Sequence, residues 1–310
     1  MQALDRLISL ARIEGRLDLR CLLNGPLEVD HASEPLGVSS FHVVLDGQCA
    51  LRRHGAQDVA LVAGDIVLLP RGQAHVIVLP ETTLAARQPT THFNGTVLVR
   101  SNVASGVPAL DLLCGRFAYA SPATLIEALP DIIKVRFTDT SLDLVVSAMR
   151  RECEAPLAGS QTIVGAMSTA LFAMTLRAWL DHAPELAGVL ALLSSKRVGQ
   201  AVIAMLEHPG KPWSIALLAD QAAMSRASFM RSYTNLSTES PLQFLGRVRM
   251  QRASGLLTDS NRSIGDVAAE VGYASETAFA RKFKEIFAVS PGQYRRDGPP
   301  RAHLQPMTAS

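Results

Sequence analysis

The sequence predicts an α+β protein with an N-terminal β-barrel or β-sandwich, a helical linker, and an all-α domain that contains two helix-turn-helix units. Three observations support this prediction. Short apolar runs separated by glycine and proline occupy residues 20 to about 120, helical periodicity follows Pro130, and residues 213–296 contain an internal repeat. The expected boundaries are 1–135 for the β domain, 136–194 for the linker, 195–296 for the all-α domain and 297–310 for a disordered tail.

The net charge of +2 is unevenly distributed along the chain. Residues 195–296 hold 14 lysines and arginines against 8 aspartates and glutamates, whereas residues 1–194 hold 15 against 19. A basic module joined to an acidic one favours a nucleic-acid-binding domain attached to a domain of another function.

Composition also indicates the cellular compartment of the protein. No apolar run reaches the roughly 18 residues that suggest a membrane span, and charged residues interrupt the apolar N-terminal stretch, which argues against a signal peptide. The four cysteines, Cys21, Cys49, Cys114 and Cys153, form no CxxC pair and no zinc-like spacing. We therefore expect a cytoplasmic protein without membrane association, with reduced and mostly buried thiols.

Short strands are expected at residues 40–45, 50–53, 59–62, 66–69 and 76–79. Turn-forming pairs such as Asp46-Gly47 and Gly64-Asp65 separate these apolar runs, which is typical of a barrel or sandwich. Beyond Pro130, an amphipathic helix is expected around residues 142–149 and a longer apolar helix at 161–182, ended by Pro184.

The internal repeat is the clearest signal in the sequence. From the serine that opens each second helix, Ser225 and Ser275, the matching residues of the two copies are 50 positions apart, and before the turn they are 49 apart. Both serines are expected to cap the following helix. In each copy two aromatic residues point inward at i, i+4 spacing while an arginine points outward; these residues are Phe229, Tyr233 and Arg231, then Phe279, Phe283 and Arg281. Two helices joined by a short turn, with polar residues outward on the second, are the design that reads the DNA major groove.

Residues 213–296 resemble the DNA-binding domain of the AraC/XylS family. The second copy carries nearly the whole family signature, from Ile264 through Gly272-Tyr273 to Tyr294-Arg295. The first copy departs modestly, with Tyr233 for the usual phenylalanine and Thr238 where a glycine is common. The resemblance implies a long helix at about 242–256 that joins the two units, which then enter successive major-groove segments.

The resemblance also implies which residues face the bases. On the first recognition helix they are Ala227, Met230 and Arg231; on the second they are Glu276, Thr277, Ala280 and Arg281. The arginines are the strongest candidates because bidentate contact of arginine with guanine is the commonest specific pairing. Residues expected to contact phosphate, or to be plain surface charges, are Arg226, Arg247, Arg249, Lys282 and Lys284.

The stretch from Gly64 through Pro70 and Gly72 to His75 fits the second cupin motif, G-x5-P-x-G-x2-H. The first cupin motif offers two histidines and a glutamate, of which this chain keeps only His42. Residues 1–135 therefore resemble the cupin sensor domain of one branch of AraC-type regulators. Enzymatic metal chemistry is disfavoured, because it needs three or four convergent ligands. His42 and His75 either form a polar pair without metal or a two-histidine metal site completed by Cys21 or another group.

Cys21 is also a candidate redox sensor, since some regulators of this architecture respond to oxidants. A reactive thiol needs exposure and a lowered pKa, which a neighbour such as Arg20 favours. The alternative is a buried apolar thiol without reactivity.

Together these features predict a transcriptional regulator, with activation as the family's more usual outcome, that senses a small ligand or oxidant through its cupin domain. The expected partners are double-stranded promoter DNA, RNA polymerase by resemblance, and a second copy of the chain through the helices at about 141–182. No cofactor is expected beyond a metal at His42 and His75. The alternatives are a cupin metalloenzyme with an accessory DNA-binding tail, and a DNA-binding protein whose barrel only drives oligomerisation.

Overall fold

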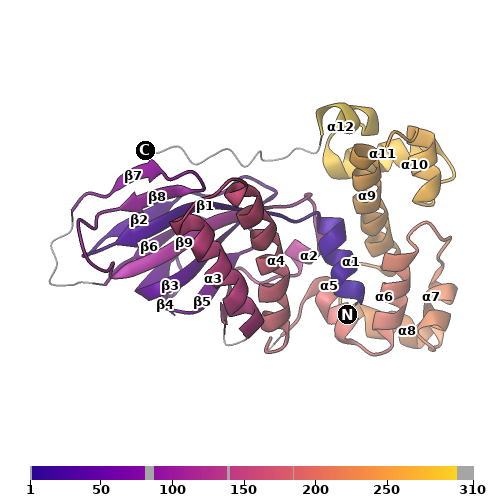
Figure 1. Cartoon of the computed structure of the whole chain (residues 1–310). Coiled ribbons are helices and arrows are strands. Elements are labelled where there is room, and N and C mark those ends of the chain that lie inside the picture. Colours follow the sequence, from indigo (N-terminus) through magenta and orange to yellow (C-terminus); the bar gives the residue numbers. More distant parts are fainter. Residues whose placement is uncertain (1, 81–86, 138–139, 184, 299–310) are drawn as a thin grey trace. The chain divides into compact units, whose positions relative to one another are not determined.

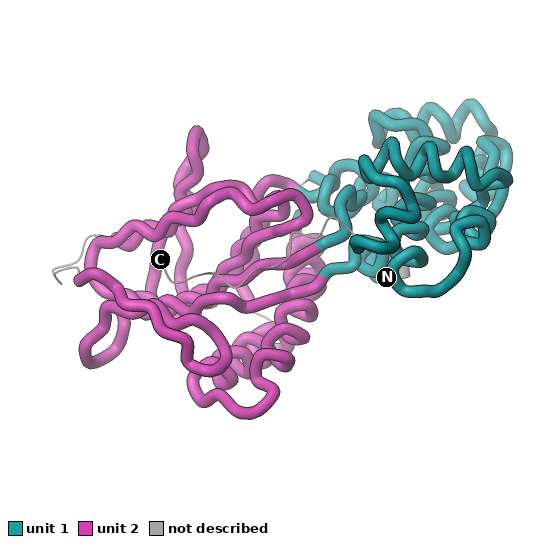
Figure 2. Tube along the Cα trace, turned by 90° about the horizontal axis from the view of Figure 1, so that it is seen from above, with its two compact units in different colours: residues 1–13, 119–129, 183–301 teal, residues 14–118, 130–182, 302–310 magenta. Residues whose placement is uncertain are grey.

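A computed structural model describes residues 2–80, 87–137, 140–183 and 185–298. The chain divides into two compact units (Figure 2). The sheet unit contains residues 14–118 and 130–182, and the helical unit contains residues 1–13, 119–129 and 183–298. The predicted disordered tail, apart from its first two residues, lies outside the described residues, as does Pro184.

The sheet unit is a curled β-sheet, which confirms the predicted fold class for this half (Figure 1). One layer has the strand order β10-β5-β3-β9-β1-β8-β7, and β2, β6, β3 and β4 pair in that order on the other side. The strands are β1 (Glu14–Leu23), β2 (Glu28–His31), β3 (Val38–Arg52), β4 (Val59–Val62), β5 (Asp65–Leu69), β6 (His75–Val78), β7 (Thr90–Phe93), β8 (Leu98–Ser101), β9 (Leu110–Ala118) and β10 (Ile133–Arg136).

The strand β3 corrects one prediction. Asp46-Gly47 was expected to be a turn between two strands, but β3 is continuous through it, with a register shift between Val44 and Asp46 and a φ of +82° at Gly47. The first part of β3 pairs with β5 and β9, and the last part pairs with β4 and β6. The bulge and glycine therefore bend one long strand so that it serves both layers.

The helices α3 (Thr140–Glu154) and α4 (Ser160–Leu180) pack on this sheet (Figure 1). Helix α4 crosses β1 at Gly15, where a Cβ atom would lie 2.5 Å from the backbone nitrogen of Thr169. The Gly15 N–H donates to Thr169 Oγ1 at 2.8 Å. Only glycine allows this close approach of strand and helix.

Helix α4 is more apolar than expected, since no apolar run long enough for a membrane span was predicted. By its length and composition alone it could cross a membrane. The bent pair α5 (Gly188–Ser194) and α6 (Val198–Glu207), in the helical unit, meets the same criterion only if taken as one broken span. Core helices of soluble proteins meet it as well, and α4 packs against β1 and α3. The finding is therefore no evidence for a membrane protein.

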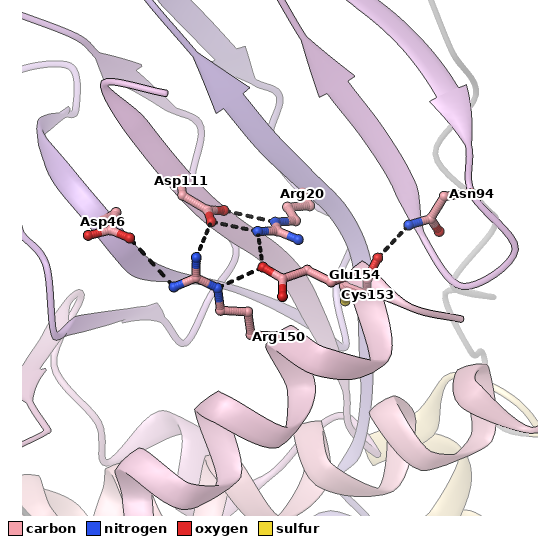
Figure 3. Close-up of polar contacts among 7 residues, drawn as sticks. All are labelled: Arg20, Asp46, Asn94, Asp111, Arg150, Cys153 and Glu154. Carbon is pink, nitrogen blue, oxygen red and sulfur yellow. Dashed lines mark hydrogen bonds and ion pairs between the residues drawn. The ribbon is translucent and has the colours of Figure 1, made fainter. Parts of the chain in front are cut away.

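A group of ion pairs fastens α3 to the sheet (Figure 3). Arg20 of β1 donates two hydrogen bonds to Asp111 of β9, at 2.9 and 2.7 Å, and one to Glu154 of α3 at 2.9 Å. Arg150 of α3 donates to Glu154 at 2.8 Å and lies 3.5 Å from Asp46. Because Arg20 and Asp111 are both buried, removing either one would leave the other with a single, more distant or more exposed partner, Arg150 for Asp111 and Glu154 for Arg20.

A second buried carboxylate, Asp65, makes stability depend on pH. Burial alone would raise the pKa of Asp65, but hydrogen bonds from Arg136, the Val62 N–H and Lys134 outweigh it and the pKa is lowered. A lowered pKa contributes stability above the ordinary value near 4, and this contribution is lost as the pH falls. We expect Asp65→Asn to lower the free energy of unfolding at pH 7 by about 1–3 kcal/mol, since the partner cations are partly exposed.

The measurement is urea unfolding of the full chain between pH 7 and pH 3, followed by Trp179 fluorescence in a Trp213→Phe background. Trp179 lies on α4 of the sheet unit. The difference between Asp65→Asn and its parent is expected to shrink as the pH falls. A difference that stays constant down to pH 3 would contradict the assigned role of the charge.

The helical unit is built from ten helices within the described residues (Figure 1). They are α1 (Gln2–Ala11), α2 (Thr124–Glu127), α5 (Gly188–Ser194), α6 (Val198–Glu207), α7 (Ile215–Gln221), α8 (Arg226–Thr234), α9 (Pro241–Asp259), α10 (Ile264–Glu270), α11 (Glu276–Phe287) and α12 (Pro291–Asp297).

The compact units differ from the predicted sequence domains in three places. The predicted linker 136–194 is divided between the units after residue 182. Residues 1–13 and 119–129 belong to the helical unit, although they precede residue 135. Arg12, at the end of α1, donates to Thr258 Oγ1 at 2.7 Å and to both carboxylate oxygens of Asp259 at 2.9 Å. Gln251 of α9 donates to the Pro122 carbonyl at 2.7 Å, beside α2. These polar contacts tie the two early segments to the long helix α9.

Candidate functional site

The two repeats form two helix-turn-helix units, α7 with α8 and α10 with α11, which α9 connects (Figure 1). Both predicted helix caps are confirmed. The Ser225 hydroxyl accepts from the Ser228 N–H, and the Ser275 hydroxyl accepts from the Ala278 N–H. The predicted connecting helix is also confirmed, and it is longer than expected at each end. Ser240 and Gln243 form a capping box at its start, and Pro241 is its first residue.

The turns of the two units have the same geometry. Ala223 in the first and Gly272 in the second occupy the left-handed region, with φ of +49° and +84°. The residue after each donates its N–H across the turn at 2.9 Å, from Met224 to the Ala219 carbonyl and from Tyr273 to the Ala268 carbonyl. The one-residue change of offset therefore falls just after this shared turn.

The predicted aromatic residues fix the orientation of the recognition helices. Phe229 and Tyr233 on α8, and Phe279 and Phe283 on α11, are fully buried. Their ring centroids are 5.9 Å apart in the first pair and 5.6 Å apart in the second. Since one face of each helix is anchored in this way, the opposite face is held toward solvent.

The opposite faces carry the residues expected to contact bases. Arg231 and Arg281 are exposed, as are three smaller or acidic candidates, Ala227, Glu276 and Thr277. Met230 and Ala280 are half-buried. The structure thus brings each predicted set together on the outer surface of its helix.

The predicted phosphate contacts divide into two groups. Arg226 and Lys284 are exposed, and Lys282 forms a helical ion pair with Glu285 at 2.6 Å. Arg247 is ion-paired with Glu127 and Glu239.

Arg249 is also directed into its own chain. It donates to the carbonyls of Pro209 at 2.8 Å and Lys211 at 2.9 Å. Burial lowers its pKa, and its guanidinium lies over the Tyr273 ring. Arg247 and Arg249 therefore form contacts within the chain that the sequence pattern did not indicate.

A histidine cluster lies inside the sheet unit. His42 on β3 is the register partner of Cys114 on β9, and His31 on β2 is the register partner of His75 on β6. His42 Nε2 lies 2.7 Å from His75 Nε2, and the rings of His31 and His75 stack with centroids 4.7 Å apart. His31 was not among the predicted residues, because only the pairing of β2 with β6 places it beside His75.

The hydrogen bonds assign the protons in the cluster. His75 Nδ1 lies 2.8 Å from the Gln73 carbonyl, which can only accept, so Nδ1 carries the proton and Nε2 is bare. His42 Nε2 then donates to His75 Nε2, and His42 Nδ1 is left as a bare, buried atom with no partner in the part of the chain that the structure describes. Burial lowers the pKa of all three histidines, that of His31 to about 3, so the imidazoles are neutral.

Cys21 lies beside this cluster and is fully buried. Its thiol is hydrogen-bonded to Cys114, and this bond, together with burial, raises the pKa of Cys114. Arg20 is engaged by Asp111 and Glu154. The exposure and the free basic neighbour expected of a reactive Cys21 are therefore not present in this structure, and all four cysteines are buried and unbridged.

Comparison with known proteins agrees with both halves. A cupin family model matches residues 2–181, more than half of the chain, and a helix-turn-helix domain model matches residues 218–297. The HTH-type transcriptional regulator MtrA of Neisseria gonorrhoeae is 34% identical over 307 residues, covering 96% of this chain and 99% of the relative. An uncharacterized HTH-type transcriptional regulator of Haemophilus influenzae is 33% identical over 296 residues, covering 96% of this chain and 99% of the relative.

A third relative is the RCS-specific HTH-type transcriptional activator RclR of Escherichia coli, which is 28% identical over 295 residues and covers 95% of this chain and 97% of the relative. The full-length similarity spans the curled sheet and both helix-turn-helix units. The chain belongs to the AraC-type, DNA-binding transcriptional regulators that carry an N-terminal cupin domain.

Proposed function

We propose that this regulator inserts α8 and α11 into successive major-groove segments of promoter DNA and activates transcription in response to a signal received by its cupin domain. The observation that carries the proposal is the matched pair of recognition helices. Each buries its aromatic face and exposes an arginine, Arg231 or Arg281, on the opposite face. A helix about 10–12 Å wide fits the B-DNA major groove, which is about 12 Å wide.

Sequence would be read by the exposed faces of the two helices. Arg231 and Arg281 would each contact guanine, and Glu276 would accept from a cytosine amine. Thr277 would contact either kind of base edge, while Ala227, Met230 and Ala280 would contact thymine methyl groups or follow groove shape. Arg226, Lys282 and Lys284 would bind phosphates, which fixes register without specifying sequence.

Activation, RNA polymerase contact, a cytoplasmic location and dimerisation are parts of the same proposal. The relative RclR is named an activator, which favours activation here. The helices expected to form the dimer expose large apolar side chains, Leu144 on α3 and Ile163 on α4, with Leu157 between them. Exposed apolar residues of this size favour a covered surface. The known relatives being transcriptional regulators, we assign no enzymatic activity.

The signal would be a small ligand or an oxidant. A signal acts by stabilising an arrangement of the chain in which both recognition helices dock on DNA. Because Cys21 is buried, an oxidant would have to reach it in a more open state of the sheet unit.

Binding of the purified full chain to its own upstream intergenic DNA, at fixed salt, tests this function. The affinity is measured before and after mild oxidation with hypochlorous acid, and again after a thiol reductant. A specific shift that responds reversibly to oxidant would support redox sensing, and a specific shift without that response would direct the search to small ligands. Failure to bind this DNA, and failure to enrich any site from a random-sequence pool, would refute the proposed DNA reading.

A further inference from the structure

We propose that His31, His42, His75 and Cys114 form a zinc-binding site in the interior of the sheet unit. His42 and His75 occupy cupin-motif positions, but His31 and Cys114 lie outside both motifs. The four residues come from β2, β3, β6 and β9, so the site would join strands of both layers. This inference concerns the sheet unit alone and stands whether or not the proposed DNA reading is correct.

Three donor atoms lie close enough to share one ion, and a fourth lies next to them. Ligand atoms of His31, His42 and Cys114 lie within 4.8 Å of one another, and His75 Nε2 lies 2.7 Å from His42 Nε2. In a tetrahedral site with Zn–N bonds of about 2.0–2.1 Å, ligand nitrogens lie about 3.3 Å apart. To bind the same ion as His42, His75 Nε2 would have to give up its hydrogen bond with His42 Nε2.

The cluster also contains the kind of atoms that a metal satisfies. His31 Nε2 and His42 Nδ1 are buried without a hydrogen-bond partner among the described residues. A buried polar atom left unpaired costs about 1–3 kcal/mol. Here two such atoms belong to neighbouring rings, those of His31 and His42, so their burial needs a compensating interaction. An ion bound to these nitrogens supplies it.

The donor chemistry selects zinc over harder cations. Three imidazoles and one thiol offer nitrogen and sulfur, whereas magnesium and calcium prefer oxygen. Zinc binds neutral imidazole and thiolate, so Cys114 would release its proton as the ion enters. The Gln73 carbonyl holds His75 by Nδ1 and directs Nε2 to the cluster, as carbonyls and carboxylates do for metal-bound histidines. Four protein ligands would make a closed site of the structural type.

The first experiment measures metal in the full chain purified without a polyhistidine tag. Elemental analysis is expected to find about one zinc per chain, and removal of zinc by a chelator is expected to lower the melting temperature of the sheet unit. Loading with Co²⁺ should produce the thiolate-to-cobalt charge-transfer absorption of a cysteine ligand. Protein that holds no zinc after growth with ample metal, and gives no Co²⁺ spectrum, would overturn the proposal in favour of a metal-free polar cluster.

Variants then test each ligand outside the cupin motifs. His31→Gln is expected to lower the affinity for zinc by about 100-fold or more. Loss of a residue that only supports a metal ligand already costs about 10- to 100-fold, and His31 would be a ligand itself. Cys114→Ser should abolish the charge-transfer absorption, whereas Cys21→Ser should retain it. The matched controls are His54→Gln, an exposed histidine, and Cys153→Ser, a buried thiol on α3; both should bind like the parent. Retention of the absorption by Cys114→Ser, or of full zinc affinity by His31→Gln, would overturn the assignment of that ligand.

Discussion

Replacing Arg281 with alanine is expected to lower the affinity for a specific operator by about 5- to 150-fold, which corresponds to about 1–3 kcal/mol. The exposed guanidinium lies on the outer face of α11, opposite the buried Phe279 and Phe283. If it makes a bidentate contact with guanine, its removal relaxes the base preference at one position only. Site selection from random DNA, followed by anisotropy titrations at fixed salt, measures both effects.

The matched control for Arg281 is Lys284→Ala on the same helix. Lys284 is exposed and is expected to bind phosphate, so its removal should weaken all sequences alike and reduce the salt slope by about one. An Arg281→Ala protein that keeps the parental base preference at every position would show that Arg281 contacts the DNA backbone instead.

Replacing Gly272 with alanine is expected to destabilise the helical unit by about 3 kcal/mol or more. The φ of +84° costs a non-glycine residue about 1 kcal/mol. In addition, a Cβ atom would lie 2.5 Å from the Gly210 carbonyl oxygen and 2.8 Å from Arg249 Nη2. The backbone contact cannot be relieved by a side-chain rotation, so the turn and the chain before α7 would have to separate.

Trp213 reports this change, because it is buried in the helical unit close to Gly210. Urea unfolding followed by its fluorescence, in a Trp179→Phe background, gives the free energy. Gly159→Ala, at the start of α4, is the control: it has a φ of +90° and no atom of the described residues within 4 Å of the added Cβ, so only the conformational cost of about 1 kcal/mol is expected. Its unfolding is followed by Trp179 fluorescence in a Trp213→Phe background. Ala223→Gly, at the turn equivalent to that of Gly272, should stabilise slightly. Equal losses for Gly272→Ala and Gly159→Ala would show that the clash is absorbed.

The sequence predicted the parts of the site that local pattern determines. The Ser225 and Ser275 caps and the buried aromatic residues follow from i, i+3 and i, i+4 relations within one helix, so spacing alone identifies them. Their repetition after 49 or 50 residues made the second unit recognisable from the first.

What the sequence left hidden depends on contacts between distant segments. His31 lies on a four-residue strand, and its place beside His75 is set by the pairing of β2 with β6. Arg249 looked like a surface cation because helical periodicity does not show that the carbonyls of Pro209 and Lys211 lie opposite it. The bend at Gly47 was read as a turn, since an Asp-Gly pair favours both and only the partners of β3 decide between them.

The placement of α1 and α2 limits how this protein can be divided. The chain passes from one unit to the other after residues 13, 118, 129 and 182. Glu14 and Ala118, the residues next to two of these crossings, are register partners in the sheet, while Arg12 is hydrogen-bonded to Thr258 and Asp259. A C-terminal fragment that begins at residue 183 would lack the buried Leu7 and the contacts of Arg12 with Thr258 and Asp259. One recombination breakpoint therefore cannot exchange either unit for that of another regulator. The sheet unit and the helical unit would have to be exchanged or redesigned together, because their segments alternate along the chain.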